Sequence, residues 1–162
     1  VAIADPSPEA AALAQSLGVA HYAALEAMLD AVRPDAAIVA TPNQLHGPHV
    51  QACIARGIAV LVEKPMAEDV ATAEAMAAAA SRAGVALLVG QFRRHNPVVA
   101  TARRFIRDGG LGRLVSVIAS STVLKPDPYF DTQWRRAQGG GPILINLVHD
   151  IDVLRHLCGE IE

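Results

Sequence analysis

The sequence predicts an α/β fold built on a parallel β-sheet, and three observations support this prediction. Short apolar runs alternate with alanine-rich helical stretches through residues 1–90. A glycine separates a helical stretch from the next apolar run three times, at Gly18, Gly57 and Gly84. The apolar runs also lack polar alternation, which favours strands that are covered by helices on both faces.

The strands and helices of this first region follow one another in strict alternation. Apolar runs predict strands, and alanine-rich amphipathic stretches that end at a glycine predict helices, because glycine readily adopts the left-handed conformation that closes a helix. We expect strands over residues 1–4, 19–22, 36–40, 58–62 and 85–89, and helices over residues 8–17, 24–31, 45–56 and 68–83. Short connections of this kind are typical of repeated αβ units.

The pattern changes after Gly90, which predicts a second domain. A helix is expected over residues 98–107 and a longer, alternating strand over 114–123. A proline-rich polar stretch at 125–136 and three glycines at 139–141 precede a helix expected from about 143 to 157. We therefore divide the chain into residues 1–91, part of a first domain, and residues 92–162, the start of a second.

Composition narrows the classes of protein to consider. With 162 residues, 52% of them hydrophobic, and a net charge of −2, the chain can build a packed core and has no basic excess for nucleic acid. Its apolar stretches are too short to cross a membrane, and no signal peptide is visible, so we expect a cytoplasmic protein. Cys53 and Cys158 are expected to be buried thiols, in preference to a disulfide or a metal-binding pair.

Polar residues follow four of the predicted strands directly. In a parallel sheet, ligands bind at the carboxyl ends of the strands, so these residues are expected to line one elongated cofactor cleft. They are Asp5, then Thr41-Pro42-Asn43, then Glu63-Lys64-Pro65, and finally Gln91-Phe92-Arg93-Arg94.

The position of Asp5 at a strand end fits an acidic residue that binds an adenosine ribose hydroxyl. Its carboxylate would repel a 2′-phosphate, which favours NAD over NADP. The alternative is an aspartate that caps a helix or shapes the turn before Pro6.

Three further side chains are candidates for binding or chemistry. Lys64 is restrained by Pro65. If it faces a bound nicotinamide, the positive charge of the oxidised ring and partial desolvation would lower its pKa enough for proton exchange near neutral pH. The alternative is a solvent-exposed lysine. His46 and His49 fall in the first turns of a helix, where solvated or capping roles are equally plausible; no cysteine or carboxylate joins them at metal-ligand spacing. His149 lies on the last helix among apolar neighbours, where histidines are more often structural than catalytic.

Taken in order, these motifs resemble the Gfo/Idh/MocA oxidoreductases. The resemblance rests on Thr41-Pro42-Asn43 with His46, Glu63-Lys64-Pro65, Trp134-Arg135, and Gly139-Gly140-Gly141 followed by His149-Asp150-Ile151-Asp152. It implies a Rossmann domain followed by an α/β domain with an open, mostly antiparallel sheet. It also implies NAD(P)-linked hydride transfer on a hydroxyl or carbonyl of a sugar, polyol or related cyclic hydroxy compound.

The resemblance also implies roles for individual residues. Lys64 is similar to the catalytic lysine of the family and His149 to its active-site histidine. The residues similar to those that line the dinucleotide are Asp5, Thr41, Pro42, Asn43, His46, Glu63, Lys64 and, less distinctly, Gln91, Arg94, Trp134 and Arg135. The full-length protein is expected to act on a small molecule as a homo-oligomer, without nucleic acid or membrane.

Two departures from the family pattern set expectations of their own. Ile145 stands four residues before His149, where the family often has an aspartate, so the usual carboxylate–lysine–histidine set is incomplete. No G-x-G-x-x-G precedes Asp5, so the sheet is expected to lack its first strand and its phosphate-binding turn. A non-catalytic NAD-binding sensor on the same fold is therefore an alternative, and another nucleotide-binding α/β protein is a third, weaker one.

Overall fold

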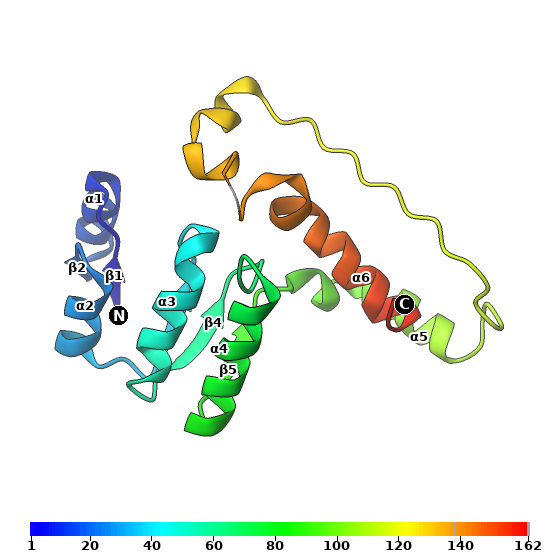
Figure 1. The fold of residues 1–162 in the computed structure, drawn as a ribbon, viewed down its shortest axis with the longest axis horizontal. Helices are drawn as coiled ribbons and strands as arrows, with labels where there is room; N and C mark the ends of the chain where they lie inside the picture. The colour runs from blue at the N-terminus through cyan, green and yellow to red at the C-terminus, as the bar shows by residue number, and fades with distance from the viewer. Residues whose placement is uncertain (138, 162) are drawn as a thin grey trace.

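Five parallel strands in two separate sheets form the framework of residues 1–91 (Figure 1). The computed structural model describes residues 1–137 and 139–161. Strand β1 (Ala2–Ala4) pairs with β2 (Ala20–Tyr22), and β4 (Ala59–Val62) lies between β3 (Ala36–Val39) and β5 (Leu87–Val89). All five strands predicted from the sequence are present and every pair is parallel, which confirms the predicted α/β class.

Four helices connect these strands. They are α1 (Pro8–Leu17), α2 (Leu25–Val32), α3 (Asn43–Ile54) and α4 (Val70–Ala83). The three predicted glycine junctions are confirmed, because Gly18, Gly57 and Gly84 have φ angles of 65°, 73° and 65°. Ser7 and Asp69 cap the first turns of α1 and α4 by accepting backbone N–H groups.

The two sheets are not hydrogen-bonded to each other within the described residues. In the doubly wound strand order 3-2-1-4-5-6, the first strand lies between the second and the fourth. The pair β1–β2 and the trio β3–β4–β5 match the two sides of that order. The separation therefore agrees with the predicted sheet that lacks its first strand.

Helices cover only one face of the three-stranded sheet. Helix α3 packs over β3 and β4 and against α4, and Val50, Val62 and Met76 are fully buried in the core that they share. On the other face, Ile38, Leu61 and Leu88 stand side by side in register and are exposed. The expectation of helices on both faces is thus wrong for the described residues: the apolar strand sequence is suited to a covered face, but no described element covers it.

The described residues after Gly90 form helices but no paired strand. It contains the 3₁₀ turn η1 (Phe92–His95), α5 (Pro97–Arg107), two 3₁₀ turns, η2 (Asp127–Asp131) and η3 (Gln133–Arg135), the π-helical turn η4 (Ile143–Leu147) and α6 (Val148–Cys158). The expected last helix is therefore present, with a π-helical first turn. Helices α5 and α6 pack together.

The strand expected over residues 114–123 is wrong for the described chain, which runs there as a long extended segment that pairs with no described strand (Figure 1). A strand needs a hydrogen-bonded neighbour, and none is described beside this segment. Its apolar side chains, such as Val115 and Ile118, are accordingly exposed. The antiparallel sheet implied for the second domain stays a prediction.

Two further expectations concern cysteines and membranes. Cys53 is buried, as expected, but Cys158 is exposed at the end of α6, so the expectation is wrong there; both are free thiols. None of the described helices is long and apolar enough to cross a membrane. The described side chains also include no group of three or more His, Cys, Asp or Glu placed to hold a metal ion.

Candidate active site

The carboxyl ends of β3, β4 and β5 lie at one edge of the three-stranded sheet, and α6 lies near this edge (Figure 1). Backbone hydrogen bonds hold the chain segments that leave the strands in line. The Glu63 N–H donates to Val39 O and the Gly90 N–H to Val62 O, each at 2.8 Å. The polar residues that follow these strands are thereby brought together with side chains of α6.

Lys64 reaches from the end of β4 to the π-helical turn before α6. Its Nζ donates a hydrogen bond of 2.9 Å to the backbone carbonyl of Ile145. The side chain is half-buried, and the Lys64–Pro65 peptide bond is cis. Desolvation is the main cause that lowers the pKa of Lys64, and the charges of Lys125 and Arg93 lower it further, against an opposing effect of Glu63.

The Ile145 carbonyl explains how the lysine is held without the aspartate that is common in the family. Residues 143–147 are π-helical, a turn type that is frequent at functional sites. Any residue type can offer its carbonyl, so the isoleucine side chain does not deprive the amine of a partner. A neutral carbonyl stabilises the ammonium ion less than a carboxylate would, and desolvation therefore prevails in setting the pKa.

His149 is buried beside Lys64 and is held by residues of the segment that follows β5. Its Nδ1 lies 3.2 Å from Oε1 of Gln91, and the ring of Phe92 meets the imidazole edge-on at 5.1 Å. Because a carbonyl oxygen only accepts, this contact places the proton on Nδ1 and leaves Nε2 with a lone pair. Desolvation, followed by the charges of Lys64 and Arg93, lowers the pKa of His149, which favours the neutral imidazole.

His46 is a buried residue that ties two of the strand-end loops together. Its Nδ1 lies 2.8 Å from the carbonyl of Pro65, and its Nε2 lies 2.8 Å from the carbonyl of Thr41. His49 approaches Thr41 Oγ1 at 3.2 Å. The alternative of a solvated histidine is therefore wrong for His46, and both of its nitrogens already have protein partners.

The glycine-rich segment docks on the start of α3. Asn43 is buried and its Nδ2 donates to the carbonyl of Gly139 at 2.8 Å. Gly140 packs directly on the backbone of the preceding turn, where a Cβ atom would lie 2.5 Å from the carbonyl oxygen of Trp134. This contact requires glycine at position 140 and brings Trp134 and Arg135 close to the segment that Asn43 binds.

Glu63 is exposed at the sheet edge. Its Oε2 accepts only a long hydrogen bond, 3.2 Å, from the backbone N–H of Lys64. Gly90 faces this carboxylate, and a Cβ there would lie 3.2 Å from Glu63 Oε1. The glycine therefore leaves the carboxylate room and acceptor capacity toward a ligand.

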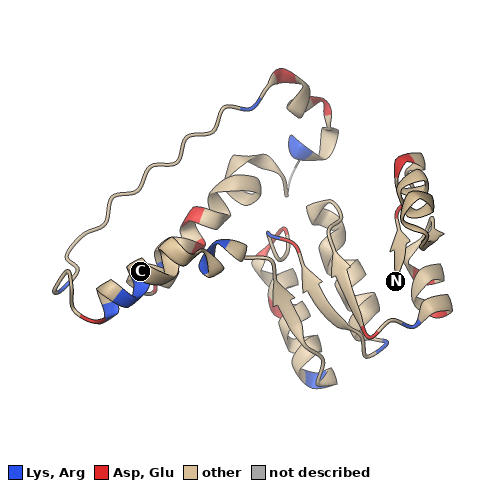
Figure 2. Ribbon diagram, turned by 180° about the vertical axis from the view of Figure 1, so that it is seen from behind, with Lys and Arg blue, Asp and Glu red and all other residues tan. Residues whose placement is uncertain are grey.

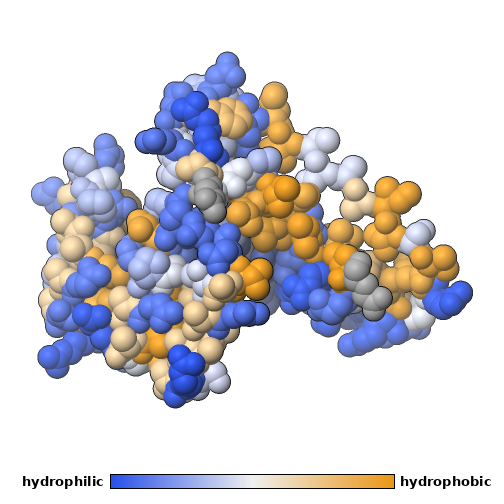
Figure 3. Space-filling model, viewed as in Figure 1, coloured by the Kyte–Doolittle hydropathy of each residue, from blue (hydrophilic) through white to orange (hydrophobic). Residues whose placement is uncertain are grey.

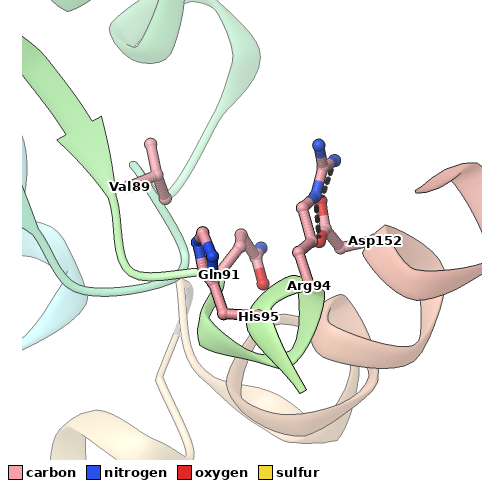
Figure 4. A pocket seen from close by; sticks show the side chains of 5 residues that line it. All are labelled: Val89, Gln91, Arg94, His95 and Asp152. Atoms are coloured by element: carbon pink, nitrogen blue, oxygen red, sulfur yellow. Dashed lines mark hydrogen bonds and ion pairs between the residues drawn. The ribbon is translucent and has the colours of Figure 1, made fainter. Parts of the chain in front are cut away.

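Arg94 forms an ion pair with α6. Its Nε lies 2.6 Å from Asp152 Oδ2, its Nη2 contacts the other carboxylate oxygen, and Asp152 is buried (Figure 4). These two residues line an open hollow of about 350 Å³ together with Val89, Gln91 and His95 (Figure 4). The hydrogen bonds of Asp152 raise the pKa of Arg94, so this guanidinium is a permanent cation with a protein partner.

Arg93 makes a parallel contact that sequence reasoning missed. It pairs with Asp150, whose other oxygen accepts a 2.8 Å hydrogen bond from Ser121 of the extended segment. Basic η1 and acidic α6 positions accordingly lie against each other in Figure 2. Adjacent arginines at 93 and 94, and aspartates two apart on one helix at 150 and 152, were the available signal for this double pairing.

The structure does not bring Asp5 to the other candidate residues. Asp5 is exposed at the end of β1, in the separate two-stranded sheet, and its Oδ1 accepts the backbone N–H of Ser7 at 2.8 Å. Hydrogen bonds with Ser7 are the main cause that lowers the pKa of Asp5. The alternative of a turn aspartate is therefore realised.

Comparison with known proteins decides the family. Residues 1–91 match the model of an oxidoreductase family with an NAD-binding Rossmann fold, and residues 99–162 match the Gfo/Idh/MocA C-terminal domain. The chain belongs to the Gfo/Idh/MocA oxidoreductase family. The resemblance drawn from its motifs is thereby confirmed.

Several members of the Gfo/Idh/MocA family are similar over nearly the whole chain. Myo-inositol dehydrogenase Hyg17 from Streptomyces leeuwenhoekii is 35% identical over 157 residues, 97% of this chain and 47% of that protein. A dTDP-3,4-didehydro-2,6-dideoxy-alpha-D-glucose 3-reductase from Streptomyces antibioticus is 32% identical over 93% of the chain and 45% of its own length. The chain thus spans about half the length of the curated relatives it matches.

Among solved structures, the WlbA dehydrogenase from Bordetella pertussis superposes with a TM-score of 0.95 at 31% identity. The match covers 100% of this chain and 48% of the WlbA chain, whose crystal structure contains NADH and UDP-GlcNAcA. The arrangement of helices and strands is therefore that of a Gfo/Idh/MocA dehydrogenase.

Proposed function

We propose that the full-length protein is an NAD-dependent dehydrogenase that acts on a hydroxyl group of a sugar, polyol or related cyclic hydroxy compound, and on the matching carbonyl in reverse. The observation that supports this most is the Lys64 amine, whose pKa is lowered and which hydrogen-bonds Ile145 close to buried His149. NADH in the WlbA crystal structure and the dehydrogenase activity named for Hyg17 support the same reaction class.

The residues at the strand ends fit a nicotinamide dinucleotide. Glu63 offers carboxylate oxygens with spare acceptor capacity, which suits ribose hydroxyl groups, and Gly90 keeps the space beside it open. We propose that Thr41, Pro42 and Glu63 contact the cofactor and that His46 and Asn43 hold the loops in place. Gln91, Trp134 and Arg135 are proposed to border the nicotinamide end.

Two of the proposed cofactor residues lie farther from this group. Asp5 is exposed and is proposed to bind an adenosine ribose hydroxyl, and its negative charge favours NAD over NADP. Arg94 is proposed to act mainly through its pair with Asp152, which fixes η1 on α6.

The proposed chemistry divides between the cofactor and two side chains. A bound nicotinamide would supply the acceptor for the hydride that leaves the carbinol carbon. Lys64, as a neutral amine, accepts the hydroxyl proton, so that the alcohol loses one hydride and one proton and becomes a carbonyl. His149 is proposed to position the substrate, because the lone pair of Nε2 can accept a hydrogen bond from a neighbouring hydroxyl, while Gln91 keeps the Nδ1 proton in place.

Lys64→Ala in the full-length protein tests this assignment. We expect turnover to fall by about 10²–10⁴-fold, because general acid–base catalysis contributes that much, with little change in the affinity for NAD. Arg82→Ala, on the exposed end of α4, is a matched control for loss of a cation. Near-normal turnover of the Lys64→Ala variant on a substrate that the wild type oxidises would contradict the role of Lys64.

A non-catalytic NAD-binding protein is the competing function, and Ile145 is the feature in its favour. The hydrogen bond from Lys64 to the Ile145 carbonyl weakens that reading, since the amine has a defined position without an aspartate. A spectroscopic screen for NADH formation with polyols, sugars and cyclic diols separates the two. No NADH formation with any of them, despite measurable NAD binding, would favour the sensor.

We extend the proposal to the setting in which the protein works. A cytoplasmic location is supported by the free thiols Cys53 and Cys158. A homo-oligomer of the full-length protein is proposed by analogy with the family, and light scattering of the purified full-length protein tests it. A monomer at micromolar concentration would contradict this part.

A further inference from the structure

A second hollow lies between the extended segment and the π-helical turn before α6. Its volume is about 280 Å³, and its polar lining consists of Ser121, Lys125 and Asn146. The remaining lining residues are apolar, and Figure 3 shows apolar side chains gathered over the start of α6. No acidic residue lines this hollow in the described part of the chain, so its only charged group is an ammonium ion.

Lys125 has no anionic partner in the part of the chain that the structure describes. Its Nζ lies 4.6 Å from the centre of the Tyr129 ring, and the guanidinium of Arg135 lies 4.2 Å from the same ring. Among residues 1–137 and 139–161, neither cation forms a salt bridge, although Asp127 and Asp131 belong to the same turn. A tyrosine ring attracts cations but carries no negative charge, so two positive charges stay uncompensated.

The hollow adjoins the candidate active site. Asn146, in its lining, directly follows Ile145, whose carbonyl binds Lys64. Lys125 is near enough for its charge to act on Lys64. A substrate with a hydroxyl at Lys64 therefore extends toward a cationic hollow that has hydrogen-bonding groups of Ser121 and Asn146 beside the ammonium ion.

We propose that this hollow binds an anionic group of the substrate, a carboxylate or a phosphate, through Lys125 with help from Asn146 and Ser121. The proposal rests on the proposed function, because it places the hydroxyl that is oxidised at Lys64. It narrows the substrate class to acidic or phosphorylated sugars and polyols.

Matched ligand pairs test the proposal by calorimetry on the full-length protein with NADH present. UDP-GlcNAcA is compared with UDP-GlcNAc, and glucuronate and glucose 6-phosphate are each compared with glucose. We expect the wild type to bind at least one anionic member at least about tenfold more tightly than its neutral partner, as expected for a charge-assisted contact. The UDP pair and glucuronate report a carboxylate, and glucose 6-phosphate reports a phosphate.

Variants at position 125 assign that preference to the hollow. Lys125→Met should reduce it to about twofold or less, Lys125→Arg should keep most of it, and the control Arg82→Met should leave it unchanged. Lys125→Gln provides a second neutral variant if the methionine variant does not fold. The proposal is overturned if the wild type shows no preference for any anionic ligand, or if the preference survives the neutral variants.

Two readouts keep this proposal separate from the proposed function. Binding is measured without turnover, so an anion preference that depends on Lys125 supports the hollow even if no alcohol is oxidised. If Lys125→Met weakens NADH binding and leaves the sugar preference intact, the ammonium ion serves the cofactor phosphates, which contradicts the proposal.

Discussion

Two cations reach the last helical segment, η4 with α6, from neighbouring strand ends, and they meet different partners. Lys64, after β4, donates to the uncharged carbonyl of Ile145, whereas Arg94, after β5, pairs with the buried carboxylate of Asp152. The pKa of Lys64 is lowered and that of Arg94 is raised. Desolvation lowers the pKa of both side chains: it prevails at Lys64, which is the more deeply buried, whereas the hydrogen bonds with Asp152 prevail at Arg94.

This difference separates a reactive contact from a structural one. An amine held by a neutral acceptor gives up its proton more easily, which suits proton exchange with an alcohol. A guanidinium held by a carboxylate stays charged and fixes two elements to each other. Changing the charge of each partner should therefore shift the pKa of Lys64 in one case and weaken the attachment of η1 to α6 in the other.

Among changes to the partners of these side chains, the largest effect is expected from Ile145→Asp, which puts a carboxylate on the residue that now offers only its carbonyl to Lys64. The carboxylate should raise the pKa of Lys64 by about one unit or more. Alcohol oxidation needs the neutral amine, so kcat/KM at pH 7 should fall about tenfold for each unit by which the pKa rises. The rising limb of the pH profile should move to higher pH by the same amount.

Carbonyl reduction distinguishes this charge effect from damage to the site. Reduction needs the ammonium form, so Ile145→Asp should preserve it at pH 7, and Ile145→Leu should leave both directions close to wild type. An equal loss in both directions would show that the substitution disrupts the site instead of shifting the pKa.

Asp152→Asn changes the structural contact and should mainly affect stability. The variant leaves Arg94 without its counter-ion, and we expect the free energy of unfolding to fall by about 1–2 kcal/mol, a modest value because Arg94 is partly exposed. Urea denaturation measures this, with Asp131→Asn on the exposed turn η2 as the control. A loss of activity without loss of stability would contradict the structural role of the pair.

The smallest effect is expected from Gln91→Glu, which changes only the partner of His149. A carboxylate beside Nδ1 stabilises the imidazolium and should raise the pKa of His149 by about one unit or less, against the effect of burial. NMR titration of the imidazole measures the shift. Gln91→Met removes the acceptor and serves as the comparison; an unchanged pKa in the glutamate variant would exclude Gln91 as the residue that positions His149.

Sequence patterns predicted the parts of the fold that depend on local contacts. Alternating apolar runs and helices, closed by Gly18, Gly57 and Gly84, are encoded within a few residues of each junction, and all of them are present. The strand expected at 114–123 was wrong because a strand needs a neighbour with which to pair. Whether the apolar row of Ile38, Leu61 and Leu88 is covered likewise depends on other elements of the fold and not on the strand sequences.

The candidate site was predictable in part for a similar reason. Strand-end positions located Lys64, and the family motif added His149. The partner of Lys64 could not be predicted, because a backbone carbonyl has no residue type and the isoleucine at 145 suggested that the partner was missing. The engagement of Arg94 with Asp152, and of His46 with two carbonyls, likewise depends on tertiary contacts.

A titration of Lys64 tests the account most directly. Lysine labelled with ¹³C at Cε is followed by NMR in the full-length protein, and Lys64→Arg assigns the signal. We predict that the amine of the wild type titrates below the range of ordinary lysines and that Ile145→Asp moves the titration upward. A wild-type amine that titrates at or above the ordinary lysine value would contradict the claim that a neutral partner prepares this lysine for proton transfer.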